Sequence, residues 1–305
     1  MSFPSDFPRR SALYVPASNR RALDKVRGID ADVLIFDLED AVAPGMRTPA
    51  RAALQDAFGQ ARFGLHQTVI RVNESASEDL PHDLDTVARC RPDAVLLPKV
   101  SRPEDLHDFA ALARTQGVPA DTELWAMIET GGGLLNLRDI VAAGRETALR
   151  LRCLVVGTND IMKETGVSGD EQRKYLVPWL MNIVLAAKQG GLGVLDGVWN
   201  DFSDLHGFEA EAVQSARMAF DGKTLIHPSQ VPVANRVFSP SVVAVERAQR
   251  IVAAFDLAEH AHAGAINLDG GMVERLHLTQ AQRLLAAHAT VQTRNAQRLI
   301  ASSAT

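Results

Sequence analysis

Two acidic residues of this chain each come after an apolar run that is typical of a buried strand. Glu129 directly follows such a run and precedes a glycine stretch, and Asp160 comes shortly after another. Because the carboxyl ends of parallel strands meet at one edge, these acids are expected to converge. Carboxylates without a neighbouring cysteine or histidine form the hard-oxygen site that Mg²⁺ prefers. We predict a magnesium site at Glu129 and Asp160, with two helix-capping acids as the alternative.

A basic residue, Arg71, lies at the end of another apolar run. A guanidinium that emerges from a barrel core is costly unless it is paired, and it can clamp a carboxylate through two hydrogen bonds. Asp37 and Glu39 fall on one side of an extended strand, where they could brace Arg71, Lys99 or metal-bound water. We predict that Arg71 faces the substrate and that Asp37 and Glu39 are catalytic. An internal ion pair for Arg71 and a solvated acidic loop are the alternatives.

Further polar and glycine residues lie next to the remaining runs. Lys99 is expected to be a fixed charge for the substrate, although a Schiff-base aldolase would keep its nucleophile at such a strand end. The backbone N–H groups of Gly132 and Gly133 open a helix and could bind a substrate carboxylate. His227 lies near the usual phosphate corner of a barrel. Arg10 could bind phosphates, with a solvated basic surface as the alternative.

The elements that must position these residues alternate between short apolar runs and stretches with helical periodicity. Runs that are apolar on both faces and separated by helices indicate a parallel sheet. Eight repeats favour a closed (β/α)₈ TIM barrel, with its chemistry at the C-terminal face. The expected strands are 12–15, 33–36, 68–72, 94–97, 124–128, 154–156, 193–195 and 224–226. The expected helices are 20–26, 49–60, 80–90, 103–115, 134–143, 175–188 and 205–218.

The pattern changes near residue 242, where more helix is expected than eight repeats require. Residues 242–258 are expected to form an amphipathic helix, followed by a glycine-rich turn at 264–272 and another helix at about 279–289. The paired glycines of the turn are compatible with a hinge. We expect a catalytic barrel domain over residues 1–240 and a C-terminal helical lid or oligomerisation segment over residues 241–305.

Composition excludes several classes of protein. The chain has 305 residues, 46% of them hydrophobic, which is enough for a large core. A net charge of −5 argues against nucleic acid as a partner, and no run is long and apolar enough for a membrane span. The N-terminus has no signal-peptide core, and the two cysteines, Cys90 and Cys153, suit a reducing compartment. We expect a cytoplasmic protein without nucleic-acid or membrane partners.

Short motifs of one enzyme family occur in order over nearly the whole chain. They are Arg10-Ser11, Tyr14-Val15-Pro16-Ala17, Phe36-Asp37-Leu38-Glu39-Asp40-Ala41-Val42, Arg71-Val72-Asn73, Leu97-Pro98-Lys99-Val100, Met127-Ile128-Glu129-Thr130, Gly157-Thr158-Asn159-Asp160 and the stretch from Gly222-Lys223 to Gln230. Each is weak alone, but the ordered set is specific. Together they resemble the citrate lyase beta-subunit-like proteins of the HpcH/HpaI aldolase/citrate lyase family, which are related to malyl-CoA and citramalyl-CoA lyases.

The resemblance implies a TIM barrel that holds Mg²⁺, with Mn²⁺ as a substitute, at Glu129 and Asp160, and an arginine, Arg71, on the substrate. It implies cleavage or formation of a carbon–carbon bond in a 3-hydroxyacyl-CoA thioester such as malyl-, citramalyl- or citryl-CoA. The products would be acetyl- or acyl-CoA and a 2-oxo acid. It also implies a homo-oligomer, trimeric or hexameric, whose C-terminal segment reaches over a neighbouring subunit's site.

The chain departs from the family pattern in its tail. Acyl-CoA lyases of the family usually carry an aspartate, which takes part in proton transfer, where Glu274 ends the run Gly270-Gly271-Met272-Val273-Glu274. The resemblance gives Glu274 this acid–base role with a longer reach, or else indicates a different substrate. Three other functions stay open. They are a class II aldolase for free 2-oxo acids, a citrate lyase beta subunit acting on an acyl-carrier-protein thioester, and a non-enzymatic barrel.

Overall fold

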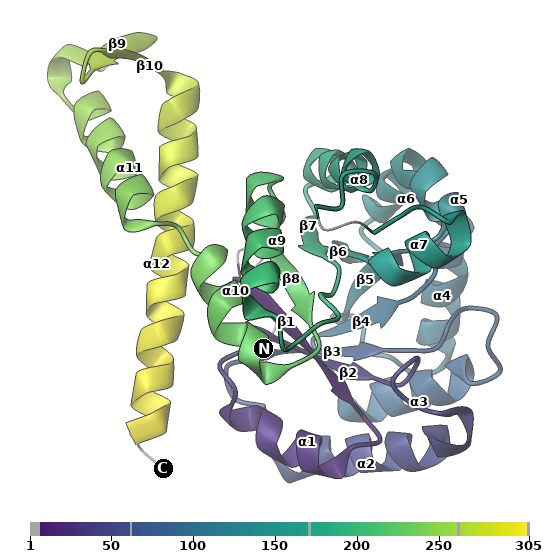
Figure 1. Cartoon of the computed structure of the whole chain (residues 1–305). Helices are drawn as coiled ribbons and strands as arrows, with labels where there is room; N and C mark the ends of the chain where they lie inside the picture. The colour runs from purple at the N-terminus through teal and green to yellow at the C-terminus, as the bar shows by residue number, and fades with distance from the viewer. Residues whose placement is uncertain (1–6, 62, 170–171, 261–262, 304–305) are drawn as a thin grey trace. The chain divides into compact units, whose positions relative to one another are not determined.

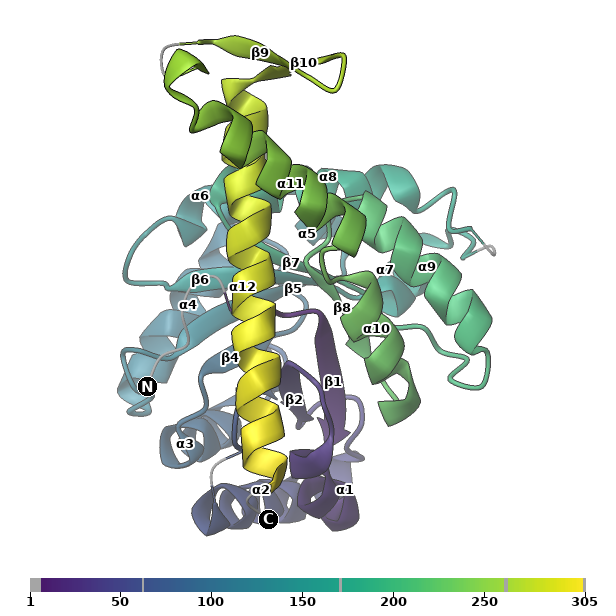
Figure 2. The same cartoon turned by 90° about the vertical axis from the view of Figure 1, so that its left-hand side faces the viewer.

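The computed structural model describes residues 7–61, 63–169, 172–260 and 263–303 (Figures 1 and 2). The chain divides into two compact units. The barrel unit contains residues 9–238, and the C-terminal unit contains residues 239–303 together with residues 7 and 8.

Eight parallel strands close the barrel unit into a barrel in which β1 pairs with both β2 and β8 (Figure 1). The predicted TIM barrel is therefore confirmed, and each predicted run overlaps one strand. The strands are β1 (Ser11–Pro16), β2 (Val33–Asp37), β3 (Gln67–Arg71), β4 (Ala94–Leu97), β5 (Glu123–Ile128), β6 (Leu151–Val156), β7 (Gly193–Asp196) and β8 (Gly222–Leu225).

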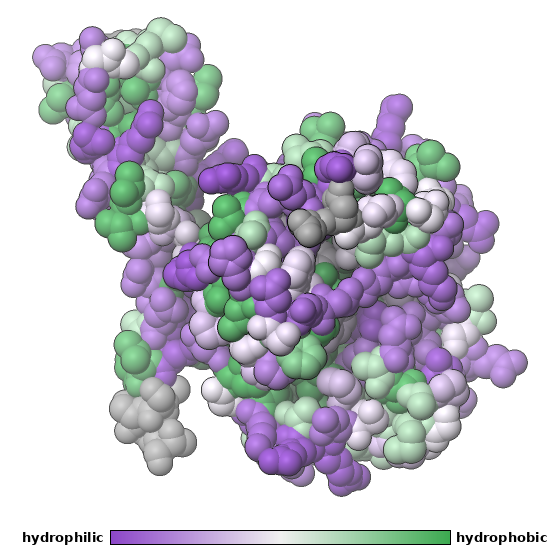
Figure 3. Space-filling view, in the orientation of Figure 1, coloured by the Kyte–Doolittle hydropathy of each residue, from purple (hydrophilic) through white to green (hydrophobic). Residues whose placement is uncertain are grey.

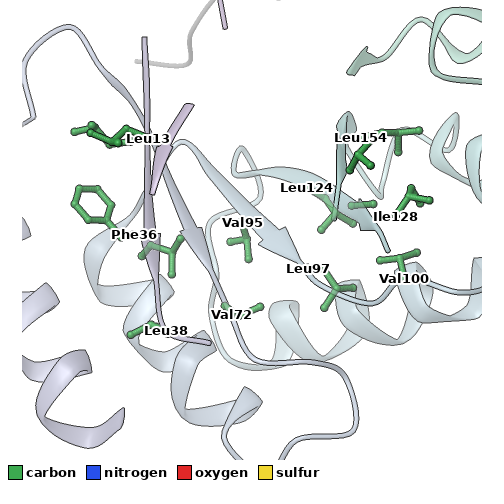
Figure 4. Packing of buried hydrophobic residues seen from close by; sticks show 14 of the residues in the cluster. Leu13, Phe36, Leu38, Val72, Val95, Leu97, Val100, Leu124, Ile128 and Leu154 are labelled. Atoms are coloured by element: carbon green, nitrogen blue, oxygen red, sulfur yellow. The ribbon is translucent and has the colours of Figure 1, made fainter. Parts of the chain in front are cut away.

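Successive side chains of each strand point alternately into the barrel and outward to the helices. The outward set forms the larger apolar core, part of which is shown in Figure 4 with Leu13, Phe36 and Leu124 among its labelled members. The inward set fills the barrel with Ala12, Val33, Ile35, Val69, Ala94, Leu96, Trp125, Met127, Cys153, Val155 and Leu195. Continued to the carboxyl ends, this alternation places Tyr14, Asp37, Arg71 and Glu129 on the inward side.

Helices follow the strands and surround the barrel (Figure 1). Two predictions match to the residue, at α3 and α4, whereas the predicted helix 134–143 is divided into α5 and α6 at Asn136. Two short helices, α7 and α10, were not predicted. The helices are α1 (Arg20–Lys25), α2 (Arg47–Gln60), α3 (Leu80–Cys90), α4 (Pro103–Thr115), α5 (Gly131–Leu135), α6 (Leu137–Gly144), α7 (Thr158–Thr165), α8 (Val177–Gly190), α9 (Leu205–Arg217) and α10 (Val231–Val237), with 3₁₀ turns η1 (Val26–Gly28), η2 (Pro44–Met46) and η3 (Pro228–Gln230).

The C-terminal unit is a helical pair joined by a β-hairpin. Helix α11 (Val242–Phe255) and helix α12 (Arg275–Ser303) lie side by side (Figure 2). Between them come the 3₁₀ turn η4 (Ala258–His260) and the antiparallel strands β9 (Ala265–Leu268) and β10 (Gly271–Glu274). None of the described helices, α12 included, is both long and apolar enough to cross a membrane.

One expectation for this unit is wrong, and one expected helix is longer than predicted. The expected glycine-rich turn at 264–272 is the hairpin itself, because Asp269 and Gly270 adopt left-handed φ angles of 53° and 79° and form its two-residue turn. The helix expected at 279–289 is part of α12, which has 29 residues. Its flanks lack the capping residues from which its ends could have been read.

Candidate active site

Arg71 ends β3 and is held by acids that follow β2. Its Nε and Nη2 donate to the two carboxylate oxygens of Asp37 at 2.8 and 2.6 Å. Nη1 donates to Asp40 at 3.2 Å, and Glu39 Oε2 lies 2.9 Å from Nη1 without hydrogen-bond geometry. The guanidinium carbon lies 4.9 Å from the centre of the Tyr14 ring. Three of the five guanidinium N–H groups are therefore used, which leaves two for a ligand.

Asp37 and Glu39 surround this guanidinium in different ways. Asp37 accepts the backbone N–H groups of Glu39 at 3.0 Å and Ala41 at 3.1 Å, which fixes its carboxylate toward Arg71. Burial raises the pKa of Glu39 to about 8, because the lowering by Arg71 is outweighed with help from Asp40 and other nearby acids. Among the described residues, none hydrogen bonds to Glu39 Oε2. This oxygen can therefore accept a proton or a ligand hydrogen.

Glu129 follows β5 and is buried at the barrel mouth. Its Oε1 accepts the backbone N–H of Lys99 at 2.8 Å, and Lys99 holds a left-handed φ of 55° that costs energy in a non-glycine residue. A Cβ atom at Gly157 would lie 2.3 Å from Oε2, so only glycine leaves room for this carboxylate. Burial and then the charge of Asp160 raise the pKa of Glu129 to about 7, against the Lys99 N–H and Arg71, which lower it.

The donors at Glu129 and Asp160 fit Mg²⁺. Asp160 lies half-buried in the first turn of α7, near enough for its charge to act on Glu129. A dication would relieve the repulsion that raises the pKa of Glu129. In the part of the chain that the structure describes, no group of three or more His, Cys, Asp or Glu residues could hold a metal ion. One or two carboxylates, with water and substrate oxygens, are the usual protein contribution to Mg²⁺.

Lys99 points its ammonium group at acids. Nζ lies 3.4 Å from Glu74 and 3.9 Å from Glu39. Burial lowers the pKa of Lys99, but the charges of these carboxylates outweigh it, so the pKa is raised. A Schiff-base lysine needs a lowered pKa to act as a nucleophile. The site therefore favours Lys99 as a fixed positive charge.

The glycines that begin α5 already donate to protein oxygens at two positions. Gly131 N–H donates to Glu164 Oε1 at 3.0 Å, and Gly133 N–H donates to Thr130 Oγ1 at 2.9 Å. Gly132 lies between them. A substrate carboxylate at Gly133 would therefore have to displace Thr130.

His227 follows β8, also at the carboxyl end of the barrel. The ring is stacked on Phe202 at a centroid distance of 4.9 Å, and Nδ1 lies 2.8 Å from Ser229 Oγ. The imidazole is exposed. It can therefore reach a ligand only at the outer rim of the mouth.

Two candidate residues lie apart from this group. Arg10 precedes β1 at the N-terminal end of the barrel, where Nε and Nη2 donate to Asp32 at 2.7 and 2.8 Å. The mouth is at the other end, so the structure does not bring Arg10 together with Glu129 or Arg71. Glu274 is the last residue of β10 in the C-terminal unit, where its N–H donates to His277 Nδ1 at 2.9 Å.

One strand-end acid, Asp196, lies outside the mouth, and one residue of the mouth, Tyr14, was not among the predicted site residues. Asp196 ends β7 as a strand-end acid, but it lies on the outward face and is buried with Lys223 and Arg173, at 2.7 and 2.9 Å. Burial raises its pKa, but these two cations lower it more. The alternation of side chains along β7 predicts this, because Leu195 points inward and the next residue, Asp196, must then point outward. The same rule places Tyr14 inward, two residues after Ala12.

The barrel and its mouth match a known family. A family model described as HpcH/HpaI aldolase/citrate lyase matches residues 10–228. The chain belongs to this family. The predicted family and the prediction of an enzyme of this lyase family are thereby confirmed.

Relatives of this aldolase/citrate lyase family member cover nearly its whole length. A (3S)-malyl-CoA thioesterase of Cereibacter sphaeroides is 45% identical over 92% of this chain and 94% of its own. An L-malyl-CoA/beta-methylmalyl-CoA lyase of the same species is 32% identical over 92% and 94%. The crystal structure of the protein CitE from Mycobacterium tuberculosis in complex with magnesium, acetoacetate and coenzyme A is 28% identical, with a TM-score of 0.75 over 93% of this chain and 99% of that one.

Proposed function

We propose that this protein is a Mg²⁺-dependent lyase that cleaves or forms the carbon–carbon bond of a 3-hydroxyacyl-CoA thioester of the malyl-CoA type. The observation that carries the proposal is that Asp160 and Arg71 both lie near enough for their charges to act on the buried Glu129 carboxylate at the barrel mouth. Glu129 and Asp160 could bind a dication, and Arg71 supplies a fixed positive charge. Together these charges suit the hydroxy-acid end of a substrate, which carries a carboxylate. The malyl-CoA lyase and thioesterase relatives support this class of substrate.

Glu129 and Asp160 would hold the metal, with Mn²⁺ as a substitute that accepts the same oxygen donors. When bound, Mg²⁺ polarises the substrate oxygens that it contacts. The raised pKa of Glu129 means that this carboxylate must lose its proton before it can bind a cation.

The remaining groups of the mouth have separate roles in this proposal. Arg71, held by Asp37, offers its two remaining N–H groups to oxygens that gain negative charge. Glu39 accepts the proton of the substrate hydroxyl through its unbonded Oε2, because a base with a pKa near neutrality suits this transfer. Lys99 adds a second positive charge.

Cleavage of the carbon–carbon bond requires a proton donor in addition to these groups. As the hydroxyl proton leaves, the carbonyl of the 2-oxo acid forms, and the electron pair of the breaking carbon–carbon bond passes to the thioester α-carbon. That carbon must take up a proton. We propose Glu274 as its donor, since this residue stands where the family's tail motif carries an acid.

Hydrolysis of the same thioester is a second candidate. One observation favours it, namely that the 45% identical relative is a (3S)-malyl-CoA thioesterase. Both reactions would bind the hydroxy-acid head at Arg71 and the metal. They differ in the bond that breaks, which in hydrolysis is the carbon–sulfur bond.

Product analysis separates the two candidates. The purified protein is incubated with (3S)-malyl-CoA, citramalyl-CoA, methylmalyl-CoA and citryl-CoA, with Mg²⁺ or with EDTA, and products are measured by mass spectrometry. Lyase activity yields acyl-CoA and 2-oxo acid in equal amounts, whereas hydrolysis yields free coenzyme A and the intact hydroxy acid. Glu129→Ala should abolish either activity, and Glu146→Ala, an exposed glutamate outside the mouth, should not.

Absence of turnover on all four thioesters would contradict the proposal. Turnover of free 2-oxo acids without any thioester would replace it with the class II aldolase. Activity only with an acyl-carrier-protein thioester would replace it with the citrate lyase beta-subunit function.

We also propose that the protein is a homo-oligomer, a trimer or a hexamer. Hydrophobic side chains are visible on the surface of both units (Figure 3). In the described part of the C-terminal unit the exposed ones are Val242, Val243, Leu257, Met272, Leu276, Leu299 and Ile300. Such side chains favour burial against another copy. Light scattering on the eluting protein tests this, and a monomer at micromolar concentration would contradict it.

A further inference from the structure

Tyr14 is a polar residue of the barrel mouth to which the proposed reaction assigns no role. It belongs to the inward set of β1 and is half-buried. Its ring lies 4.9 Å from the guanidinium carbon of Arg71. Within the described ranges, no residue forms a hydrogen bond with its hydroxyl group, and this oxygen is not among the fully buried polar atoms that lack a partner, so it remains accessible.

The surroundings of this phenol are rich in acceptors. Burial raises the pKa of Tyr14 most, Arg71 lowers it, and the charges of Asp37, Glu129 and Glu39 raise it further. These charges therefore lie close to the ring. The phenol remains neutral, and its O–H is a donor among carboxylates.

The mouth is short of free donors for an acidic ligand. Arg71 has already committed three of its five N–H groups to Asp37 and Asp40. Lys99 is turned toward Glu74 and Glu39. A hydroxy acid or oxo acid brings several acceptor oxygens. The hydroxyl of Tyr14 is an uncommitted donor beside the guanidinium that is proposed to bind them.

We infer that the Tyr14 hydroxyl donates a hydrogen bond to an oxygen of the substrate's hydroxy-acid or oxo-acid head, while its ring holds the Arg71 guanidinium in place. The inference rests on the proposed function for the identity of that head. The hydroxyl contacts the ligand, and the ring positions Arg71.

Two substitutions separate these parts. Tyr14→Phe removes the hydroxyl and keeps the ring, and kcat/KM should fall about 10- to 100-fold, as for a lost hydrogen bond to a charged group. Tyr14→Leu also removes the ring, so its loss should be larger. The chain has one other tyrosine, Tyr175, which is exposed beside Lys174. Tyr175→Phe is therefore the matched control and should leave kcat/KM unchanged.

A second measurement does not depend on turnover. Protein labelled with 3-fluorotyrosine should give two ¹⁹F resonances, which Tyr175→Phe assigns. Malate and glyoxylate, each with Mg²⁺, should shift the Tyr14 resonance and leave that of Tyr175 in place.

The outcomes distinguish this inference from the proposed function. If the wild type turns over a thioester and Tyr14→Phe retains full kcat/KM, the inference is overturned while the function stands. If the wild type is inactive on every thioester, the function fails and the resonance decides. A shifted Tyr14 signal then supports the contact with the acid, and an unmoved signal overturns it.

Discussion

Replacing Glu129 with glutamine is expected to stabilise the metal-free protein while removing its response to Mg²⁺. The carboxyl group is buried, and its pKa of about 7 lies above the ordinary value of 4.5. The folded state therefore holds this proton more tightly than the unfolded chain, so its contribution to stability falls as pH rises from about 4.5 to about 7. A shift of this size corresponds to about 3 kcal/mol. Glutamine avoids that loss and can still accept the Lys99 N–H through its carbonyl oxygen.

Thermal unfolding of wild type and Glu129→Gln in EDTA measures the effect. At pH 8 the variant should melt roughly 5 °C higher, and at pH 4.5 or below the two should be close. Added Mg²⁺ should raise the Tm of the wild type alone. A variant that melts below the wild type at pH 8, or that still responds to Mg²⁺, would refute the reasoning.

The control is the same substitution at Glu123, the first residue of β5. Glu123 accepts hydrogen bonds from Arg9 Nη2 at 3.1 Å and Trp125 Nε1 at 3.2 Å. Glu123→Gln leaves the buried Arg9 without its charge partner, so it should lower the Tm at pH 8. A higher Tm for Glu129→Gln and a lower Tm for Glu123→Gln would show that the change in Tm depends on the charges around each carboxylate.

Three further predictions concern the mouth and the core. Arg71→Lys cannot keep both hydrogen bonds to Asp37, so kcat/KM should fall about 10²-fold in steady-state assays, and near-normal turnover would contradict its role. Mg²⁺ affinity, measured by calorimetry, should weaken up to about tenfold per pH unit below pH 7 because Glu129 must lose a proton, and a flat profile would contradict this. Lys223→Met strands Asp196 beside Glu211 in the core and should cost about 3 kcal/mol or more in urea unfolding, whereas unchanged stability would show that Arg173 suffices.

The barrel could be predicted because its strands carry their signal locally. A parallel strand covered on both faces is apolar at every position, as in Val33–Asp37 up to its last residue, and the helices between such runs show their own period. The hairpin of the C-terminal unit was missed although Asp269-Gly270 is a strong two-residue turn signal. The glycines around it were interpreted as a hinge instead.

The site was less predictable, because it depends on which way each side chain points and on how deeply it is buried. Arg10 and Asp196 are charged residues at strand ends, but one lies at the wrong end and the other on the wrong face. Alternation along β7 indicates that Asp196 points outward, and the place of Arg10 before β1 puts it at the N-terminal end of the barrel. The raised pKa values of Glu39 and Glu129 could not be predicted from the sequence, since they depend on how deeply the folded barrel buries each group.

The charges at the barrel mouth also set an order of events. Once the pH is high enough to ionise Glu39 and Glu129, five carboxylates, Asp37, Glu39, Asp40, Glu129 and Asp160, face two cations, Arg71 and Lys99, a formal excess of three negative charges. An acidic thioester that approached the metal-free protein would then be repelled. Binding should therefore be sequential, with the cation entering first and the thioester closing over it. In initial-rate kinetics the substrate would then behave as a ligand of the cation-loaded protein alone, and saturating substrate would slow the escape of the cation between turnovers.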